Sequence, residues 1–318
     1  MKKMAIIASA EEKSKLKGQG FLPQRDGIHF ACRVITEDGC LNSKETRVLS
    51  EIAEKYGRGY MSYTTRLTVE IPWIRFEDIQ KVKEELSEAG LEGGGTGPRV
   101  RPVVACKGTV CIFGLLDTQE LARKIHERFY KGYYNVLLPH KFKIGIGGCP
   151  NNCIKPDLND FGIMGQRVPD CNEDLCLGCK KCSVEEACKK GAAKVINGKL
   201  QIDRKKCTNC GLCIDKCHYG SMVCKKDGVK LFIGGKWGKT PRRGEPLKGI
   251  YLYDEAMDII EKAILYYRDN GKTGERFGDM VERIGFEEVS KGILGNEILH
   301  EKEEILKAEV HTKRNYSC

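Results

Sequence analysis

Two cysteine runs of the same spacing constrain this chain more than any other feature of its sequence. Residues 176–182 and 207–213 each hold three cysteines at C-x2-C-x2-C spacing, and a fourth cysteine, Cys188 or Cys217, follows each run. Most of the seventeen cysteines lie between residues 171 and 224. Three thiolates at this spacing can hold three corners of an iron–sulfur cubane. The repeat therefore predicts two [4Fe–4S] clusters in one short module.

The cysteine content also indicates the compartment. Disulfide frameworks belong to oxidising compartments, whereas metal clusters are typical of reducing ones. Residues 1–10 resemble a secretory signal, but their apolar run is short and Glu11 and Glu12 follow it at once. No apolar run approaches the roughly 18 residues that a membrane-spanning helix needs. We therefore expect a cytoplasmic protein without a membrane span.

The runs resemble those of bacterial two-cluster ferredoxins, in which the fourth cysteine of each run ligates the other cluster. This resemblance implies one cluster on Cys176, Cys179, Cys182 and Cys217, and a second on Cys207, Cys210, Cys213 and Cys188. Two details depart from the usual pattern. Five residues separate Cys182 from Cys188, and Lys189 and His218 stand where a proline commonly follows the fourth cysteine. The longer gap resembles ferredoxin variants with an enlarged loop beside one cluster.

A separate set of four cysteines lies upstream in two glycine-containing turns. Four residues separate Cys106 from Cys111, and three separate Cys149 from Cys153. Turns allow the backbone to bring all four sulfurs inward around one cluster. Structural zinc sites use similar gaps, so the spacing alone leaves zinc as an alternative. The segments around these cysteines favour the cluster.

Those segments resemble the siroheme-dependent sulfite and nitrite reductases. The matches follow the family's order and comprise residues 63–66 (YTTR), 100–106 (VRPVVAC), 138–143 (LPHKFK) and 148–153 (GCPNNC). In this family one cysteine of the quartet also bridges the cluster to the siroheme iron, and the resemblance assigns that role to Cys153. The family commonly has five residues between the first two cysteines of the quartet, where this chain has four. The implied cofactors are siroheme and three [4Fe–4S] clusters.

Four basic residues in the matched segments correspond to the family's substrate cage: Arg66, Arg101, Lys141 and Lys143. Arginine presents a fixed fork to an oxyanion, and a crowded lysine suits proton donation because its pKa shifts readily. The two lysines are two apart at the start of a predicted strand, residues 142–146, which Lys141 directly precedes, so both are expected on one face. Each residue alone is more often a solvated surface charge. Together, in four matched segments, they predict an anion site.

Apolar periodicity predicts an α+β fold. The expected strands are residues 28–35, 66–71, 142–146, 160–165 and 229–233. The expected helices are a first one capped by Ser43, then residues 76–86, 117–130, 254–269, 275–284 and 296–307. The glycine-rich residues 91–98 mark a hinge or a domain boundary.

The resemblance implies a domain plan. A ferredoxin-like sulfite/nitrite reductase half-domain is expected at residues 1–95, and a siroheme and [4Fe–4S] catalytic domain at residues 96–168 and 227–295. The two-cluster ferredoxin module, residues 169–226, is then an insertion in the catalytic domain, and residues 296–318 form a C-terminal helix and tail. In length, single repeat and inserted module, the chain resembles the C subunit of anaerobic sulfite reductase.

The remaining cysteines are not expected to bind a cluster, although one of them could. We expect Cys32, Cys40 and Cys318 to be free or buried thiols and Cys171 and Cys224 to be structural, although Cys171 could substitute for a cluster ligand. His140 stands where the family often has a basic residue, and we expect it to cap a turn.

The formal charge of +10 would ordinarily suggest a nucleic-acid partner. Each four-thiolate cluster carries a charge of about −2 when oxidised, and siroheme carries carboxylates that need cationic partners. Much of the basic excess is therefore expected to be internal counter-charge, and we expect no nucleic-acid partner.

The implied reaction is the six-electron reduction of sulfite to sulfide, with electrons relayed through the ferredoxin clusters to a coupled siroheme–[4Fe–4S] centre. A siroheme nitrite reductase is the near alternative. A non-catalytic polyferredoxin is a further one, although a pure electron carrier has no use for the basic cage.

The partners also follow from the resemblance. The chain has no G-x-G-x-x-G segment, so a flavoprotein or ferredoxin-type donor is expected. The single copy of the repeat predicts a homodimer or higher oligomer with shared active sites. A homologous second subunit and a self-sufficient monomer are the alternatives.

Overall fold

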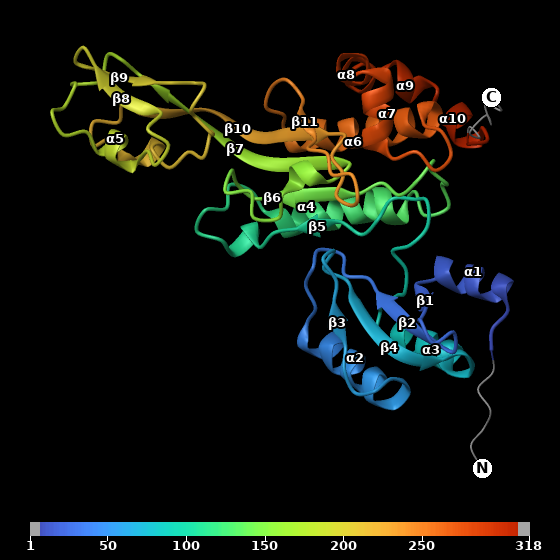
Figure 1. Cartoon of the computed structure of the whole chain (residues 1–318). Helices are drawn as coiled ribbons and strands as arrows, with labels where there is room; N and C mark the ends of the chain where they lie inside the picture. Colours follow the sequence, from blue (N-terminus) through green and yellow to red (C-terminus); the bar gives the residue numbers. More distant parts are fainter. Residues whose placement is uncertain (1–6, 311–318) are drawn as a thin grey trace.

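The computed structural model describes residues 7–310, so residues 1–6 of the signal-like segment and Cys318 lie outside the described residues. The chain forms three parts (Figure 1): an N-terminal domain (residues 7–95), a central domain (residues 96–171 and 222–310), and a cysteine lobe (residues 172–221) at the end of a two-stranded ribbon. Among the described residues no helix has both the length and the apolar character that a bilayer crossing requires.

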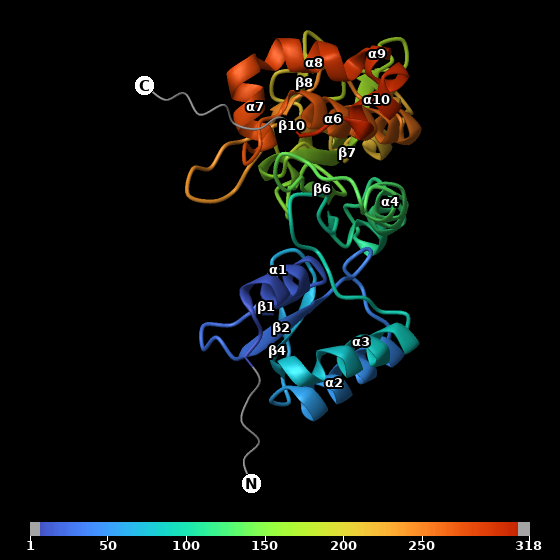
Figure 2. The ribbon, with the colours of Figure 1, turned by 90° about the vertical axis from the view of Figure 1, so that its right-hand side faces the viewer.

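The N-terminal domain is an antiparallel sheet in the order β1-β2-β4-β3, with α2 and α3 side by side against it (Figure 2). Phe30, Ile52 and Val82 are among the buried residues that join the two layers. The strand–helix–strand–helix order expected for residues 28–89 is confirmed. The elements are α1 (Ala10–Gly18), β1 (Phe21–Pro23), β2 (His29–Val34), α2 (Ser43–Tyr56), β3 (Ser62–Tyr63), β4 (Val69–Arg75), η1 (Phe76–Asp78) and α3 (Ile79–Glu88).

The N-terminus of α2 corrects one expectation. Ser43 is the first helical residue, and Asn42 is the cap. The Asn42 side chain accepts hydrogen bonds from the backbone N–H groups of Lys44 and Glu45, each at 2.9 Å, and Glu45 reaches back to the Asn42 N–H. Asparagine caps helices as well as serine does, and the helix therefore begins one residue earlier than expected.

β4 begins at Val69 rather than at residue 66, because residues 64–68 form the turn between β3 and β4. The backbone N–H of Leu67 donates to Thr64 O (3.0 Å), and Leu67 adopts a left-handed φ of 60°. The turn leaves Arg66 at the tip of a hairpin that points toward the central domain (Figure 1).

The glycine-rich segment, expected as a hinge or a domain boundary, connects the N-terminal and central domains. Its backbone pairs with the end of β2: Ile35 N donates to Glu92 O and Gly94 N donates to Arg33 O, both at 3.0 Å. These bonds hold the segment against the N-terminal sheet.

The central sheet has the order β11-β10-β7-β6-β5, in which β5, β6 and β7 are parallel and β7, β10 and β11 antiparallel. α4 packs against β5 and β6, and the expected helix 117–130 continues from α4 into a π-helical turn, η3. The elements are β5 (Val104–Ala105), η2 (Gly108–Val110), α4 (Thr118–Ile125), η3 (His126–Lys131), β6 (Ile144–Gly147), η4 (Pro156–Leu158), β7 (Phe161–Cys171), β10 (Met222–Ile233) and β11 (Glu245–Pro246).

β7 and β10 are much longer than the strands expected at residues 160–165 and 229–233. They pair from Phe161 opposite Ile233 to Cys171 opposite Met222, with one register shift beside Cys224. The outer half of β10 carries the exposed charges of Lys225, Lys226 and Asp227, and that of β7 holds the half-buried Arg167 and Asp170, so no apolar alternation marked either extension. The cysteine lobe sits at the end of this ribbon and contains α5 (Ser183–Ala187), β8 (Ala193–Ile196), β9 (Lys199–Ile202) and η5 (Ile214–Lys216).

Five helices complete the central domain: α6 (Tyr253–Asn270), α7 (Phe277–Ile284), α8 (Phe286–Leu294), α9 (Glu297–His300) and α10 (Lys302–Lys307). The helices expected at residues 254–269 and 275–284 are confirmed, whereas α8 was not expected. The single helix expected at residues 296–307 is broken near Glu301 into two short ones. α6 and α7 contact the segment just before β6 through the rings of Phe142, Tyr267 and Phe277.

Candidate active site

Arg66, at the tip of the β3–β4 hairpin, crosses from the N-terminal domain into the central domain. Its guanidinium donates from Nη1 to Asn159 Oδ1 (3.0 Å) and from Nη2 to the carbonyl oxygens of Pro102 (2.6 Å) and Ile144 (3.1 Å). Nε is buried without a hydrogen-bond partner. Burial lowers the pKa of Arg66 to about 10. The side chain therefore fastens the hairpin and keeps a cation at the domain interface.

Arg101, Lys141 and Lys143 are brought together by two paired extended segments. The backbone N–H of Arg101 donates to Phe142 O (2.8 Å), and the Phe142 ring is fully buried. Because side chains alternate along an extended chain, Lys141 and Lys143 both point to the face opposite the Phe142 ring. The two lysines do not lie within β6, which begins one residue after Lys143, so the expected strand is correct in place but too long at its start.

The four predicted basic residues act on one another electrostatically. Burial lowers the pKa of Lys143 to about 8, with contributions from the positive charges of Arg66, Arg276 and Lys141. The pKa of Lys141 is also lowered, first by burial and then by Arg276 and Arg101. The structure therefore gathers the predicted residues and adds Arg276. We call these five residues the basic cage: Arg66, Arg101, Lys141, Lys143 and Arg276.

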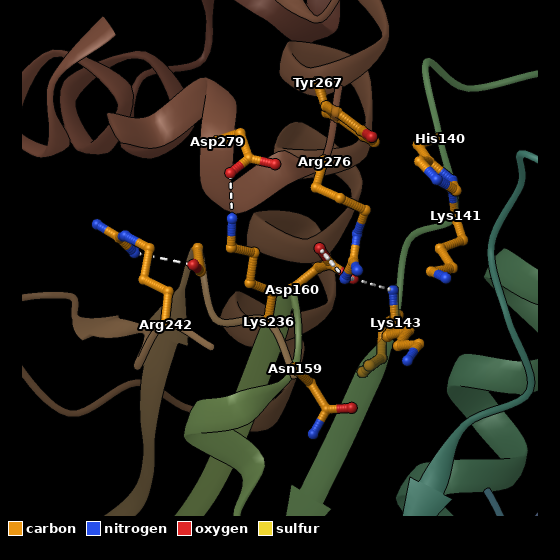
Figure 3. Close-up of polar contacts among 12 residues, drawn as sticks. His140, Lys141, Lys143, Asn159, Asp160, Lys236, Arg242, Tyr267, Arg276 and Asp279 are labelled. Atoms are coloured by element: carbon orange, nitrogen blue, oxygen red, sulfur yellow. Dashed lines mark hydrogen bonds and ion pairs between the residues drawn. The ribbon is translucent and has the colours of Figure 1, made fainter. Parts of the chain in front are cut away.

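The one buried carboxylate of this group, Asp160, was not expected from the sequence (Figure 3). Arg276 Nη2 donates to both of its oxygens, at 2.9 and 2.8 Å, and the backbone N–H of Lys143 donates to Oδ2 at 2.9 Å. Asp160 is wholly inaccessible to solvent. Burial raises its pKa, while Arg276 opposes the rise. Asp160 thus orients Arg276 and anchors the lysine segment.

The basic cage carries more positive charge than its surroundings neutralise. Asp160 interacts electrostatically with four of the five cations, all except Arg101, and the Nε atoms of Arg66, Arg101 and Arg276 are buried without a partner. Buried cations are costly unless an anion pairs with them. The arrangement is therefore suited to binding anionic groups.

Two further cations beside the cage are already paired. Lys236 forms an ion pair with Asp279, and Arg242 donates to Gly234 O (2.8 Å) and to Glu245 (2.5 Å) (Figure 3). They shape the loop between β10 and β11. His140 is likewise engaged, because its Nδ1 accepts from the backbone N–H of Lys141 (2.8 Å), as expected for a turn cap.

The upstream cysteine quartet forms where two loops meet backbone to backbone. A Cβ added at Gly148 would lie 3.0 Å from Gly108 Cα, so glycine suits this close approach of the two loops. The Gly148 N–H donates to Cys106 Sγ (3.1 Å). Burial raises the pKa of the Cys149 thiol, and the charges of the other three thiolates add to the rise, which shows that all four are neighbours. Cys153 is the exposed member.

The lobe cysteines separate into two groups. A cavity of 360 Å³ is lined by Cys188, Cys207, Cys210 and Cys213. Cys176 and Cys217 lie elsewhere: Cys176 Sγ accepts from Leu200 N (3.3 Å), and Cys217 Sγ contacts Ser221 Oγ (3.0 Å). Within residues 7–310, no three His, Cys, Asp or Glu side chains converge closely enough to hold a single metal ion. The four thiols of the first group instead line a cavity.

Comparison with known proteins identifies the family. Residues 96–302 match the family described as nitrite and sulphite reductase 4Fe-4S domain, and residues 22–89 match the nitrite/sulfite reductase ferredoxin-like half domain. The chain belongs to the nitrite and sulfite reductase family. The first match covers the cysteine quartet and all of the basic cage except Arg66, which lies in the second.

Relatives within the family are sulfite reductases. The chain is 32% identical over 294 residues to the coenzyme F420-dependent sulfite reductase of Methanocaldococcus jannaschii, covering 92% of this chain and 45% of that protein. It is 29% identical over 286 residues to the C subunit of the anaerobic sulfite reductase of Salmonella typhimurium, covering 80% and 81%. A resemblance to the C subunit of anaerobic sulfite reductase is expected from the sequence. The sequence identity to the F420-dependent enzyme is slightly higher than the identity to that subunit. The chain spans less than half the length of the first relative.

The fold has a solved counterpart. A crystal structure of dissimilatory sulfite reductase I superposes with a TM-score of 0.66 at 20% identity, covering 83% of this chain and 69% of that one. This likeness concerns the fold alone.

Family membership implies siroheme and a [4Fe–4S] cluster, and the residues present fit both groups. The unpartnered Nε atoms of the basic cage can meet anionic oxygens, and four neighbouring thiols, with Cys153 exposed, can hold a cluster. Sequence reasoning missed Asp160 and Arg276, which lie 116 residues apart. Asp160 directly precedes β7 and Arg276 directly precedes α7, and neither residue belongs to a sequence motif that would mark it as part of a site.

Proposed function

We propose that this chain reduces sulfite to sulfide at a siroheme coupled to a [4Fe–4S] cluster held by Cys106, Cys111, Cys149 and Cys153. The observation that carries the proposal is the basic cage, in which five cations lie together and four of them interact with one carboxylate, Asp160. A carrier that only passes electrons has no need for a buried anion site. The names of the relatives support sulfite as the anion.

Within the cage, each residue has a distinct task. Arg101 and Lys141 bind the oxygens of sulfite, and Asp160 holds Arg276 in place for the same purpose. Lys143 Nζ, with a pKa of about 8, carries a proton near neutral pH and can release it to an oxygen that leaves the substrate. Arg66 contributes charge, because its Nη atoms are occupied by protein oxygens. Siroheme, when bound, would supply the redox-active iron that the sulfur–oxygen chemistry needs.

We further propose that Cys153 bridges the cluster to the siroheme iron, since it is the quartet's exposed thiol. The cysteine lobe holds two more [4Fe–4S] clusters, one on Cys176, Cys179, Cys182 and Cys217 and one on Cys207, Cys210, Cys213 and Cys188. Electrons come from a separate flavoprotein or ferredoxin-type donor.

The test is to purify the chain without oxygen and to measure its spectrum, its iron and its activity. We expect siroheme absorption and about thirteen irons per chain, four for each of three clusters and one for siroheme. With reduced methyl viologen as electron source, sulfide should form from sulfite. Faster formation of ammonia from nitrite would replace sulfite by nitrite as the substrate. A protein that contains zinc, or one that holds clusters without siroheme, would overturn the proposal.

A further inference from the structure

Two cavities lie between the cysteine lobe and the central domain, and both adjoin the same lobe quartet. The cavity of 360 Å³ is lined by the four thiols of this quartet and also by Pro150 and Asn151, which belong to the second turn of the upstream quartet. The loops of two cysteine centres therefore face each other across one space.

The second cavity, of 280 Å³, lies where three loops meet. Residues 112–115 follow the first pair of upstream cysteines, residues 149–151 belong to the second pair, and residues 210–212 come from the lobe. Arg167, from β7, lines the same cavity. The other lobe quartet has no cysteine in the lining of either cavity.

Arg167 fixes this arrangement with both its backbone and its side chain. Its N–H donates to Asn209 O (2.8 Å), and Nη1 donates to Asp215 Oδ2 (3.0 Å). Its aliphatic carbons cover Gly211, which has a left-handed φ of 70° and where an added Cβ would lie 2.8 Å from Arg167 Cβ. Arg167 thus holds the cysteine loop of the lobe on β7, beside Cys149.

We infer that electrons leave the lobe through the centre on Cys207, Cys210, Cys213 and Cys188, and that Arg167 is the positioning residue for this transfer. The inference rests on the proposed function, because it takes both quartets as cluster ligands. In each step one electron passes from the reduced lobe cluster, which is oxidised, to the upstream cluster, which is reduced, and no atom or proton moves. The centre on Cys176, Cys179, Cys182 and Cys217 is then the entry point for an external one-electron donor protein.

Arg204 offers a matched control for Arg167. It also ties the lobe to β7, because it donates to Pro169 O (2.6 Å) and Asp170 Oδ1 (2.7 Å), but it lines neither cavity. Arg167→Ala and Arg204→Ala therefore each remove one guanidinium from the lobe attachment. Only the first change lies between the two centres.

The experiment uses the anaerobic holoprotein, a photoexcited flavin as reductant and rapid-freeze EPR of the clusters. Arg167→Ala should slow reduction of the upstream cluster about tenfold, as expected for the loss of a charge-assisted contact, while iron content stays unchanged. Arg167→Lys, which keeps the charge, should recover part of the rate. Arg204→Ala should transfer electrons like the wild type. Equal rates in Arg167→Ala and the wild type would overturn the role of Arg167.

The order of the centres is tested with ligand variants. Cys210→Ser should stop electron transfer from the lobe to the upstream cluster. Cys179→Ser should leave this transfer intact, because a small reductant can reduce the centre that contains Cys210 directly. The reverse result would overturn the order. Both readings depend on cluster signals and not on sulfite, so a protein that transfers electrons in this order but does not reduce sulfite would contradict only the proposed function.

Discussion

Lys143 and Cys149 stand at opposite ends of the same strand, β6 (Ile144–Gly147). Four residues of strand at about 3.3 Å each place roughly 13 Å between these ends. β5, parallel to β6, separates Arg101 from Cys106 in the same way. This spacing separates the lysine segment from the first cysteine of the second pair. Active sites completed by a second copy remain the prediction from the single copy of the repeat.

A shared site predicts complementation between two inactive variants. Lys141→Ala/Lys143→Ala destroys the cage and Cys153→Ser destroys the bridge, so neither homodimer should be active. After subunit exchange, half of the dimers are mixed and each has one intact site, so about a quarter of wild-type activity should return. Sulfide formation measures the recovery. A fully active monomer, or demonstrated exchange without recovery, would show that each chain works alone or with a different subunit.

Lys143 should set the alkaline limb of the pH profile. Its pKa is lowered from 10.5 to about 8, so the protonated form is lost as pH rises through about 8. If this proton is used in the reaction, kcat/KM for sulfite should fall above that pH. In Lys143→Arg the charge persists to much higher pH, so activity should be low and its alkaline limb absent. An unchanged limb in this variant would assign the titration to another group.

Removing the carboxylate of Asp160 should destabilise the fold strongly. Asp160→Asn leaves Arg276 buried with a neutral partner, which typically costs about 3–5 kcal/mol. Asp279→Asn is the control, because the Asp279–Lys236 pair is partly exposed and its loss should cost about 1 kcal/mol or less. Denaturant titration measures both free energies of unfolding. Similar losses in the two variants would mean that Asp160 does not neutralise Arg276.

Cys153→Ser should separate the siroheme from its cluster magnetically. If Cys153 is the bridge, the spin coupling between the two centres should disappear in EPR and Mössbauer spectra. Cys40→Ser, which changes an exposed thiol outside the cysteine quartets, should keep the coupling. Normal coupling in Cys153→Ser would identify another cysteine as the bridge.

The residues that sequence could predict are those whose role depends on local spacing. The cysteine runs and the segments around Arg66, Arg101 and Lys143 are recognisable because neighbouring positions define them. The ion pair of Asp160 and Arg276 forms only because two distant segments approach in the fold, and the residues next to each of them in the sequence do not predict it. The outer halves of β7 and β10 were missed for a related reason. They are stabilised by pairing with each other, and charged residues interrupt any apolar alternation along them.

The ends of the cysteine lobe meet at a single facing pair, Cys171 and Met222. The chain therefore leaves the central domain and returns to it at nearly the same point, as guest domains do in tolerant insertion sites. Replacing residues 172–221 by a tight turn would close β7 and β10 into an ordinary hairpin and leave the central sheet intact. Ancestors of this chain could thus have gained, lost or exchanged the whole lobe in one genetic event without disturbing the fold that received it.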